Sequence, residues 1–179
     1  MTQLSVVFMG GRQAGCVGLL TLFGAECRVL GAVAYDAPVK TLAEALRVPT
    51  FESILDPGVR ALLGRADLLV SVHGREVVPE DLLRLPVHGG INVHPCLSVY
   101  KGAHPIERLL RDQHPTASVG VHRMTSQVDA GEALVEQFVD VAGKRSADEV
   151  YNALYPVYAI TLLTALQRLR QAHESALPR

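Results

Sequence analysis

The chain is poor in aromatic residues and in cysteine, and its charges are balanced. Tryptophan is absent from its 179 residues, and aromatic residues make up 5% of them. The three cysteines are odd in number and lack CxxC spacing, which favours a reducing cytoplasm. The formal net charge is −1. This balance predicts neither a nucleic-acid surface nor an anionic membrane as a partner.

Long apolar runs are also missing. None approaches the length of a bilayer span, so we expect no membrane-embedded segment. The N-terminus, Met1-Thr2-Gln3, leads straight into a strand-like segment and lacks the basic region of a secretory signal. No linker, low-complexity tract or repeat divides the chain. With 49% hydrophobic and 20% charged residues, we predict one globular domain over residues 1–179, without a C-terminal accessory domain.

The first half of the chain alternates strand-like and helix-like segments. The expected strands are Leu4–Met9, Arg28–Tyr35 and Asp67–Val72. The expected helices are Cys16–Phe23, Val39–Arg47 and a segment to Leu63 that opens with Asp56 as N-cap and Pro57 at the first helical position. Such alternation predicts an α/β fold, a Rossmann-like open and mostly parallel sheet with helices on both faces.

The second half adds two further strands and a long helix. Ala117–Met124 alternates and predicts a half-buried antiparallel strand near an edge, followed by a strand at Ala133–Val141. A capping box at Ser146–Glu149 opens a helix to about His173, which Pro156 should kink. Its apolar stripe is predicted to face the core. The alternative is a partner interface, which leaves a homo-oligomer open. The stripe consists of Val150, Leu154, Leu162, Ala165, Leu166 and Leu169.

The segment Ile91–Pro105 concentrates the polar chemistry. Ile91 and Val93 alternate with Asn92 and His94, so Asn92 and His94 share one face of a strand that Pro95 ends. Ligands of open α/β sheets bind at such carboxyl ends. An amide donor beside a titratable ring suits acyl transfer to an amine.

Asp129, in the loop Thr125–Gly131, is the candidate third member. It could hold His94 in one tautomer and favour its charged form. From spacing alone, the alternative is that Asp129 is an ordinary aspartate in a turn. Asn92, His94 and Asp129 are the set that the residues favour.

Two other chemistries were weighed against this set. Five of the 7 histidines fall between His88 and His122, but their gaps do not match familiar zinc motifs, so we expect no metal and mostly loop or surface histidines. Cys96 lies two residues from His94 and could be a nucleophile. Adjacent loop positions rarely give nucleophile and base the right geometry, which favours a packed thiol.

The loop after the first strand is glycine-rich. Gly10–Gly15 leads into an apolar helix, and such a strand, loop and helix N-terminus can bind an anion. The pattern is neither GxGxxG nor a P-loop, so a tight turn without a ligand is the alternative.

These residues resemble the folate-dependent formyltransferase family. The family pattern is Asn-x-His-Pro-Ser-Leu-Leu-Pro-x-x-x-Gly, followed about thirty-five residues later by an Asp in a Leu-Asp-x-Gly context. The chain reads Asn-Val-His-Pro-Cys-Leu-Ser-Val-Tyr-Lys-Gly from Asn92, with one residue fewer before the Gly, and Val-Asp-Ala-Gly from Val128. Flanking matches occur at 75–79, 103–106 and 118–122. The resemblance covers most of the chain. Cys96 and Ser98-Val99 depart from the pattern in a loop that borders the amine substrate in relatives.

The resemblance implies transfer of a formyl group from formyl-tetrahydrofolate to a primary amine, without a metal or covalent intermediate. Asn92 and protonated His94 would stabilise charge on the formyl oxygen, and Asp129 would orient His94 and raise its pKa. The pterin is expected between two loops. Its expected contacts are Arg75, Val77, Val78, Ser126, Gln127 and Val128.

The acceptor is expected to be a small amine, phosphorylated or nucleotide-linked, such as an amino sugar or an amino ribonucleotide. We expect the carboxyl end of the first strand to lie next to His94 and to anchor the acceptor. Its expected contacts are Gly10, Gly11, Arg12, Lys101 and His104. Hydrolysis of formyl-tetrahydrofolate, or a catalytically silent folate- or nucleotide-binding module, are the alternatives.

Overall fold

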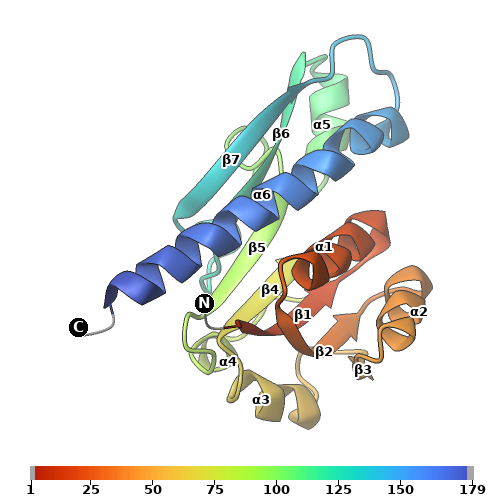
Figure 1. The fold of residues 1–179 in the computed structure, drawn as a ribbon. Coiled ribbons are helices and arrows are strands. Elements are labelled where there is room, and N and C mark those ends of the chain that lie inside the picture. Colours follow the sequence, from red (N-terminus) through yellow and green to blue (C-terminus); the bar gives the residue numbers. More distant parts are fainter. Residues whose placement is uncertain (1–2, 177–179) are drawn as a thin grey trace.

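A seven-stranded sheet forms the centre of the molecule (Figure 1). The computed structural model describes residues 3–176, and the expectations for Met1 and Thr2 lie outside this range. In chain order the elements are β1 (Ser5–Gly10), α1 (Arg12–Gly24), β2 (Arg28–Ala34), α2 (Ala37–Ala45), β3 (Thr50–Phe51), α3 (Pro57–Leu63), β4 (Leu68–Val72), α4 (Glu80–Leu83), β5 (Gly90–Pro95), α5 (Pro105–Arg111), β6 (Thr116–Arg123), β7 (Ala133–Asp140) and α6 (Ala147–Ala176).

The strand order is β3-β2-β1-β4-β5-β6-β7. Neighbours from β3 to β5 run parallel, and β6 and β7 are antiparallel to their neighbours. The predicted Rossmann-like, mostly parallel sheet with an antiparallel edge is therefore confirmed. One expectation is wrong: β1 is not next to β5, because β4 lies between them.

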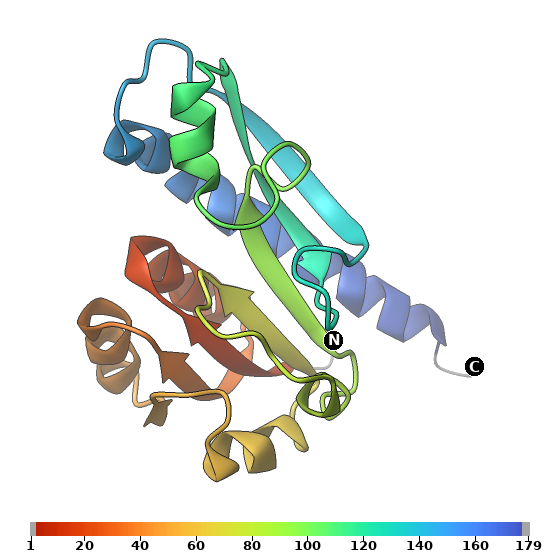
Figure 2. The ribbon, with the colours of Figure 1, turned by 180° about the vertical axis from the view of Figure 1, so that it is seen from behind.

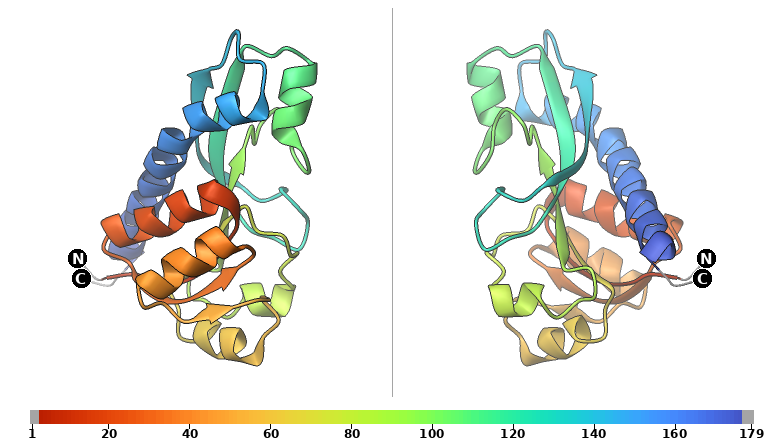
Figure 3. Two further views of the ribbon diagram at one scale, coloured as in Figure 1. Left: turned by 90° about the vertical axis from the view of Figure 1, so that its right-hand side faces the viewer. Right: turned by 90° about the vertical axis from the view of Figure 1, so that its left-hand side faces the viewer.

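Each face of the sheet carries its own apolar layer. In β1, Val6 and Phe8 pack with α1, α2 and α6, whereas Val7 and Met9 pack with α3 and α4. The alternating direction of side chains along a strand explains this division. α6 crosses in front of β5, β6 and β7 in Figure 1 and behind them in Figure 2. On that face α1 lies beside α6 (Figure 3).

The glycine-rich segment is shorter than the sequence suggested. Gly10 ends β1, Gly11 is the N-cap of α1, and the helix begins at Arg12, not at Cys16. The Asp36 carboxylate accepts a hydrogen bond from the Arg12 backbone N–H at 2.5 Å. This cap comes from the far end of β2, so local sequence could not reveal it.

The C-terminal half differs from expectation in one strand. β6 is buried over most of its length, not half-buried, because α6 packs against it and Leu97 packs at Gly120, and β7 forms the edge. At the start of α6, Ser146 N–H donates to the Glu149 carboxylate and Glu149 N–H donates to Ser146 Oγ, which confirms the capping box. The helix continues past Pro156. All six residues of its predicted stripe are buried in the core.

Among the described residues, none of the helices combines the length and the hydropathy that a bilayer crossing requires.

Candidate functional site

Two cavities meet at the carboxyl end of β5. Both are lined by Asn92 and His94, which lie on one face of β5 as the alternation predicted. Gly74, Arg75, Gly102 and Ala103 also line both. A molecule in either cavity therefore reaches the same amide and the same imidazole.

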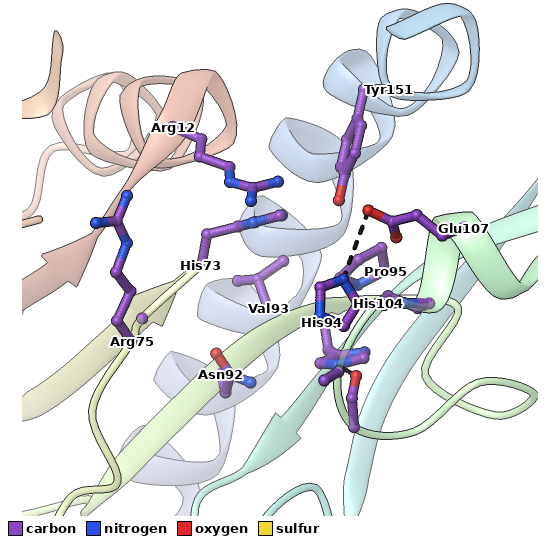
Figure 4. A pocket seen from close by; sticks show the side chains of 14 residues that line it. Arg12, His73, Arg75, Asn92, Val93, His94, Pro95, His104, Glu107 and Tyr151 are labelled. Carbon is purple, nitrogen blue, oxygen red and sulfur yellow. Dashed lines mark hydrogen bonds and ion pairs between the residues drawn. The ribbon is translucent and has the colours of Figure 1, made fainter. Parts of the chain in front are cut away.

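The first cavity has a volume of about 270 Å³ (Figure 4). Its lining residues are Arg12, His73, Gly74, Arg75, Asn92, Val93, His94, Pro95, Gly102, Ala103, His104, Pro105, Glu107 and Tyr151. Arg12 and His73 lie together on one wall, and Glu107 and Tyr151 lie across from them (Figure 4). A smaller hollow continues from this cavity and shares Arg12, His73, Glu107 and Tyr151 with it.

The second cavity has a volume of about 370 Å³ and is lined by two loops, 74–78 and 124–129. Val77 and Val128 are each 64% exposed, so apolar side chains flank this opening. Five of the six residues expected to contact the pterin line the cavity, namely Arg75, Val77, Val78, Gln127 and Val128. Ser126 is exposed and is not among its lining residues.

Asp129 joins the two candidate side chains of β5 into one network. One of its carboxylate oxygens lies 3.2 Å from His94 Nε2 and accepts the Gly102 N–H at 2.9 Å. The other oxygen lies 3.2 Å from His122 Nε2. Asn92 Nδ2 lies 3.3 Å from the same His122 nitrogen. The structure therefore brings Asn92, His94 and Asp129 together through a fourth residue that sequence analysis did not select.

His122 is buried, in contrast to the expectation of a loop or surface histidine. The register between β5 and β6 pairs His122 with Asn92, which places the two side chains next to each other. His122 Nδ1 lies 2.8 Å from the Arg123 carbonyl oxygen. The sequence did place His122 on an alternating strand. It did not show that this strand pairs with β5, or that His122 lies opposite Asn92.

His94 carries its ring hydrogen on Nε2, because this nitrogen faces two acceptors, the Asp129 carboxylate and the Gly102 carbonyl at 3.2 Å. Nδ1 is buried and has no hydrogen bond within the described residues. Burial lowers the pKa of His94 more than the Asp129 charge raises it. Asp129 thus raises the pKa of His94 as expected, but desolvation outweighs the ion pair and the net shift is downward.

Asp129 keeps its charge despite being 7% exposed. Burial by itself would raise its pKa, but the His122 hydrogen bond, the His94 charge and the Gly102 N–H bring it down to about 2. The loop is held in place nearby, since a Cβ on Gly131 would lie only 1.8 Å from the Arg123 carbonyl oxygen. Only glycine allows this close approach.

Four of the eight described non-glycine residues with left-handed backbone line the cavities. Arg12, His73, His104 and Asp129 all line a cavity and have φ between 51° and 59°. Such conformations cost non-glycine residues energy and persist only where the surrounding structure enforces them. The fold thus uses strained backbone to direct side chains toward this region.

The predicted acceptor contacts are only partly assembled. Arg12 and His104 line the first cavity, whereas Gly10, Gly11 and Lys101 are not among its lining residues. A Cβ on Gly10 would lie 2.4 Å from the Phe8 ring, so this glycine serves packing. The Asp36 carboxylate at the start of α1 also occupies part of the expected anion cradle.

His73, Glu107 and Tyr151 are cavity residues that the sequence analysis missed. His73 follows β4 directly, and β4 is the true neighbour of β5. Burial and the nearby Arg12 charge lower the pKa of His73 to about 4, so its ring is neutral at pH 7. The signal available was a histidine at a strand end, the same signal that selected His94.

Cys96 does not have the surroundings of a reactive nucleophile. Cys96 is 2% exposed, and burial raises the pKa of its thiol. Within residues 3–176, no three histidine, cysteine or acidic side chains gather in a way that could hold a metal ion.

Comparison with known proteins places the chain in a family. Residues 34–166 match the model of the formyl transferase family. Methionyl-tRNA formyltransferase of Geobacter metallireducens is 28% identical over 187 residues, which cover 95% of this chain and 60% of that protein. The same enzyme of Pelotomaculum thermopropionicum is 28% identical over 193 residues, covering 98% of this chain and 61% of that protein. The chain therefore spans about 60% of the length of these relatives.

Solved structures show the same fold. The phosphoribosylglycinamide formyltransferase from Anaplasma phagocytophilum superposes with a TM-score of 0.80 at 20% identity, covering 96% of this chain and 89% of that one. A formyltetrahydrofolate deformylase from Pseudomonas syringae gives a TM-score of 0.78 at 22% identity, covering 92% of this chain and 60% of that one. The fold and site define an α/β protein of the formyltransferase class. The chain belongs to the folate-dependent formyltransferase family.

Proposed function

We propose that this chain transfers a formyl group from formyl-tetrahydrofolate to a primary amine of a small acceptor. The observation that carries the proposal is the meeting of two cavities at Asn92 and His94. A reaction between two bound molecules needs such a shared point, where the reacting atoms are held close together. The amine attacks the formyl carbon of formyl-tetrahydrofolate, the bond between that carbon and the folate nitrogen breaks, and the folate nitrogen leaves with the proton that the amine loses.

Asn92 is assigned to the formyl oxygen. Its Nδ2 has two hydrogens, of which the contact with His122 can use only one. The second is available to the oxygen on which charge develops. Losing one such donor costs on the order of 10²–10³ in rate in a well-studied hydrolase.

His94 is assigned to the proton. It is neutral in the free protein, since its pKa is lowered, and the lone pair is on Nδ1. A proton taken from the attacking amine at Nδ1 gives an imidazolium whose Nε2–H points at Asp129. Nδ1 is covered in this conformation, so the ring must shift to present it. Asp129 holds the other nitrogen during that shift and stabilises the charged ring.

The second cavity is the proposed folate side. A pterin is flat, with apolar faces and hydrogen-bonding edges. Val77 and Val128 offer apolar contacts at the opening, and the two loops offer backbone groups to the edges. These residues suit a pterin ring, and a pterin bound there would lie beside His94, which lines the same cavity.

The first cavity is the proposed acceptor side, and a phosphorylated or nucleotide-linked amine is the proposed class. Arg12 offers a guanidinium fork suited to phosphate or carboxylate. Arg12→Ala should raise the acceptor KM about tenfold or more and leave the folate KM unchanged, the pattern of a lost binding contact. An unchanged acceptor KM would remove Arg12 from the proposal.

The test is a screen of amino sugar nucleotides and amino ribonucleotides with formyl-tetrahydrofolate. We expect amine-dependent release of tetrahydrofolate and a product with one added formyl group. Asn92→Ala and His94→Ala should reduce the rate at least about a hundredfold, whereas Asn152→Ala and His114→Ala, outside both cavities, should not. Far-UV circular dichroism and melting temperature verify that the variants are folded.

Hydrolysis is the outcome that would replace this proposal. Water in the first cavity could receive the formyl group with the same three residues, and a deformylase shares the fold. Folate release that is independent of any amine, with formate as product, would establish it. Binding of formyl-tetrahydrofolate without turnover would leave a silent binding module.

A tRNA-linked acceptor is the alternative that the relatives' names raise. We propose a small acceptor instead, because the first cavity holds about 270 Å³ and the net charge is −1. Binding to tRNA needs many phosphate contacts and weakens steeply with salt. Tight, salt-sensitive binding of methionyl-tRNA, or its formylation, would contradict the proposal.

A further inference from the structure

His73 and the buried Tyr158 form a hydrogen-bonded pair behind the first cavity. Tyr158 lies on α6, is 1% exposed, and its hydroxyl oxygen lies 2.7 Å from His73 Nε2. Within the described residues, the hydroxyl group makes this one hydrogen bond. The tilted rings also lie close together, with centroids 5.7 Å apart.

The pair fixes where His73 carries its hydrogen. A buried hydroxyl that fails to donate its hydrogen loses the energy of a hydrogen bond. Nε2 is the acceptor within reach of Tyr158, so the hydroxyl donates to Nε2, and Nε2 must be the nitrogen without hydrogen. Because the neutral ring has one hydrogen, that hydrogen is on Nδ1. The low pKa of His73 agrees with a neutral ring.

His73 Nδ1 opens to the cavity. Nδ1 makes no hydrogen bond to the described residues. It is also absent from the fully buried polar atoms that have no hydrogen-bond partner, so it is accessible from outside the protein. His73 lines the first cavity and its continuation, as Arg12 does. Figure 4 shows the Arg12 guanidinium next to the His73 ring. Two donors, one charged and one neutral, thus face the same space.

We infer that Tyr158 holds His73 as the Nδ1–H tautomer, and that this N–H and Arg12 together bind an anionic oxygen of the acceptor. The oxygen belongs to a phosphate or a carboxylate. Glu107, across the cavity, repels an anion and restricts it to the Arg12 and His73 wall. The inference rests on the proposed function only in calling the anion part of the acceptor. Tyr158 does not touch the anion and is a positioning residue.

The experiment uses nitrogen-15 spectra of the histidine rings in the full chain. We expect His73 Nε2 to appear as a nitrogen without hydrogen and Nδ1 as a nitrogen with one. Inorganic phosphate is then added, and acetate in a parallel titration, to distinguish the two kinds of anion. The Nδ1–H signal should shift with one of them, and Arg12→Ala should weaken that binding about tenfold.

Two substitutions of His73 separate its nitrogens. An asparagine amide occupies the place of Nδ1, and a glutamine amide reaches the place of Nε2. His73→Asn should therefore keep anion binding, whereas His73→Gln keeps the Tyr158 contact and should weaken anion binding about tenfold. Tyr158→Phe should allow both tautomers and weaken binding by less than His73→Gln. Tyr100→Phe removes a different tyrosine hydroxyl, bonded to Asp112, and serves as the control.

The outcomes are distinguishable from those of the proposed function. A hydrogen on Nε2, no shift with either anion, or equal effects of His73→Asn and His73→Gln would overturn the inference even if formyl transfer occurs. The predicted tautomer and His73-dependent anion binding would support it even if no amine is formylated.

Discussion

At the scale of single residues, Asp129 sets the behaviour of the His94 ring. Its charge raises the pKa of His94, although burial has the larger and opposite effect. Asp129→Asn should therefore lower the pKa of His94 further and move the acid limb of the kcat/KM profile to lower pH. The maximal rate should also fall, because the imidazolium loses its partner. The measurement is kcat/KM against pH, with Asp140→Asn as control. An unmoved acid limb would contradict the assigned role.

Cys96 provides a second test at this scale. Its thiol is buried and its pKa is raised, so little thiolate exists at neutral pH. Cys96→Ser should retain activity, because direct attack by an amine needs no thiol. Steady-state rates and a search for a formyl thioester by mass spectrometry check this. A trapped thioester on Cys96 would reverse the assignment.

The residue types of the site were predictable, but their connections were not. Asn92 and His94 could be placed because alternation and the following Pro95 act within six residues of chain. His122, which bridges Asn92 and Asp129, depends on the register of two strands. His73 depends on the strand order, which places β4 beside β5. Register and order are tertiary properties that a single sequence does not display.

At the scale of elements, Glu76 fastens the loop that borders the second cavity. Its carboxylate accepts hydrogen bonds from Tyr35 Oη at 2.7 Å, Ser53 Oγ at 2.6 Å and Ile54 N–H at 2.9 Å. Burial alone would raise the pKa of Glu76, but these donors lower it overall. The loop is thereby tied to segments that follow β2 and β3.

Loosening this anchor should affect the folate side selectively. Glu76→Ala should raise the KM for formyl-tetrahydrofolate about tenfold, since charge-assisted hydrogen bonds are lost, and change the acceptor KM little. Initial rates with each substrate varied in turn measure this, and Glu80→Ala on the exposed side of α4 is the control. Equal effects on both KM values would show that the anchor serves the fold in general.

The elements that carry strong local patterns were the ones that sequence predicted. β4 has five buried residues in a row, and α6 has a capping box and a continuous stripe. β3 was missed because it has two residues, too few for any period. The start of α1 was misplaced because Asp36, from a distant part of the chain, caps it.

At the scale of the whole molecule, buried histidines predict sensitivity to mild acid. The pKa of His73 is about 4 in the folded state, and that of His94 is also lowered. Unfolding exposes rings that bind protons near pH 6.5. The free energy of unfolding should therefore be highest above pH 6.5 and fall as pH drops toward 4, with His73 contributing up to about 3 kcal/mol.

Urea unfolding at a series of pH values measures this contribution. His73→Gln should flatten the decline between pH 6.5 and 4, and His104→Gln, whose side chain is 75% exposed, should not. Asp129, whose pKa is about 2, adds a separate decline only below pH 4. A wild-type stability that is constant between pH 7 and 4 would contradict the lowered pKa and the neutral state of His73.

The division of the site into two cavities has a kinetic consequence. Part of the wall of each cavity is its own: α1, α5 and α6 line only the first, and the segments 76–78 and 124–129 line only the second. Neither substrate has to pass through the binding site of the other, so either can bind first. Under the proposed function, both must be bound before the formyl group is transferred. Initial-velocity plots should therefore intersect, and the acceptor should not exchange a formyl group with the protein when folate is absent. A parallel pattern would instead point to a formylated side chain, and Cys96 would be the first to inspect.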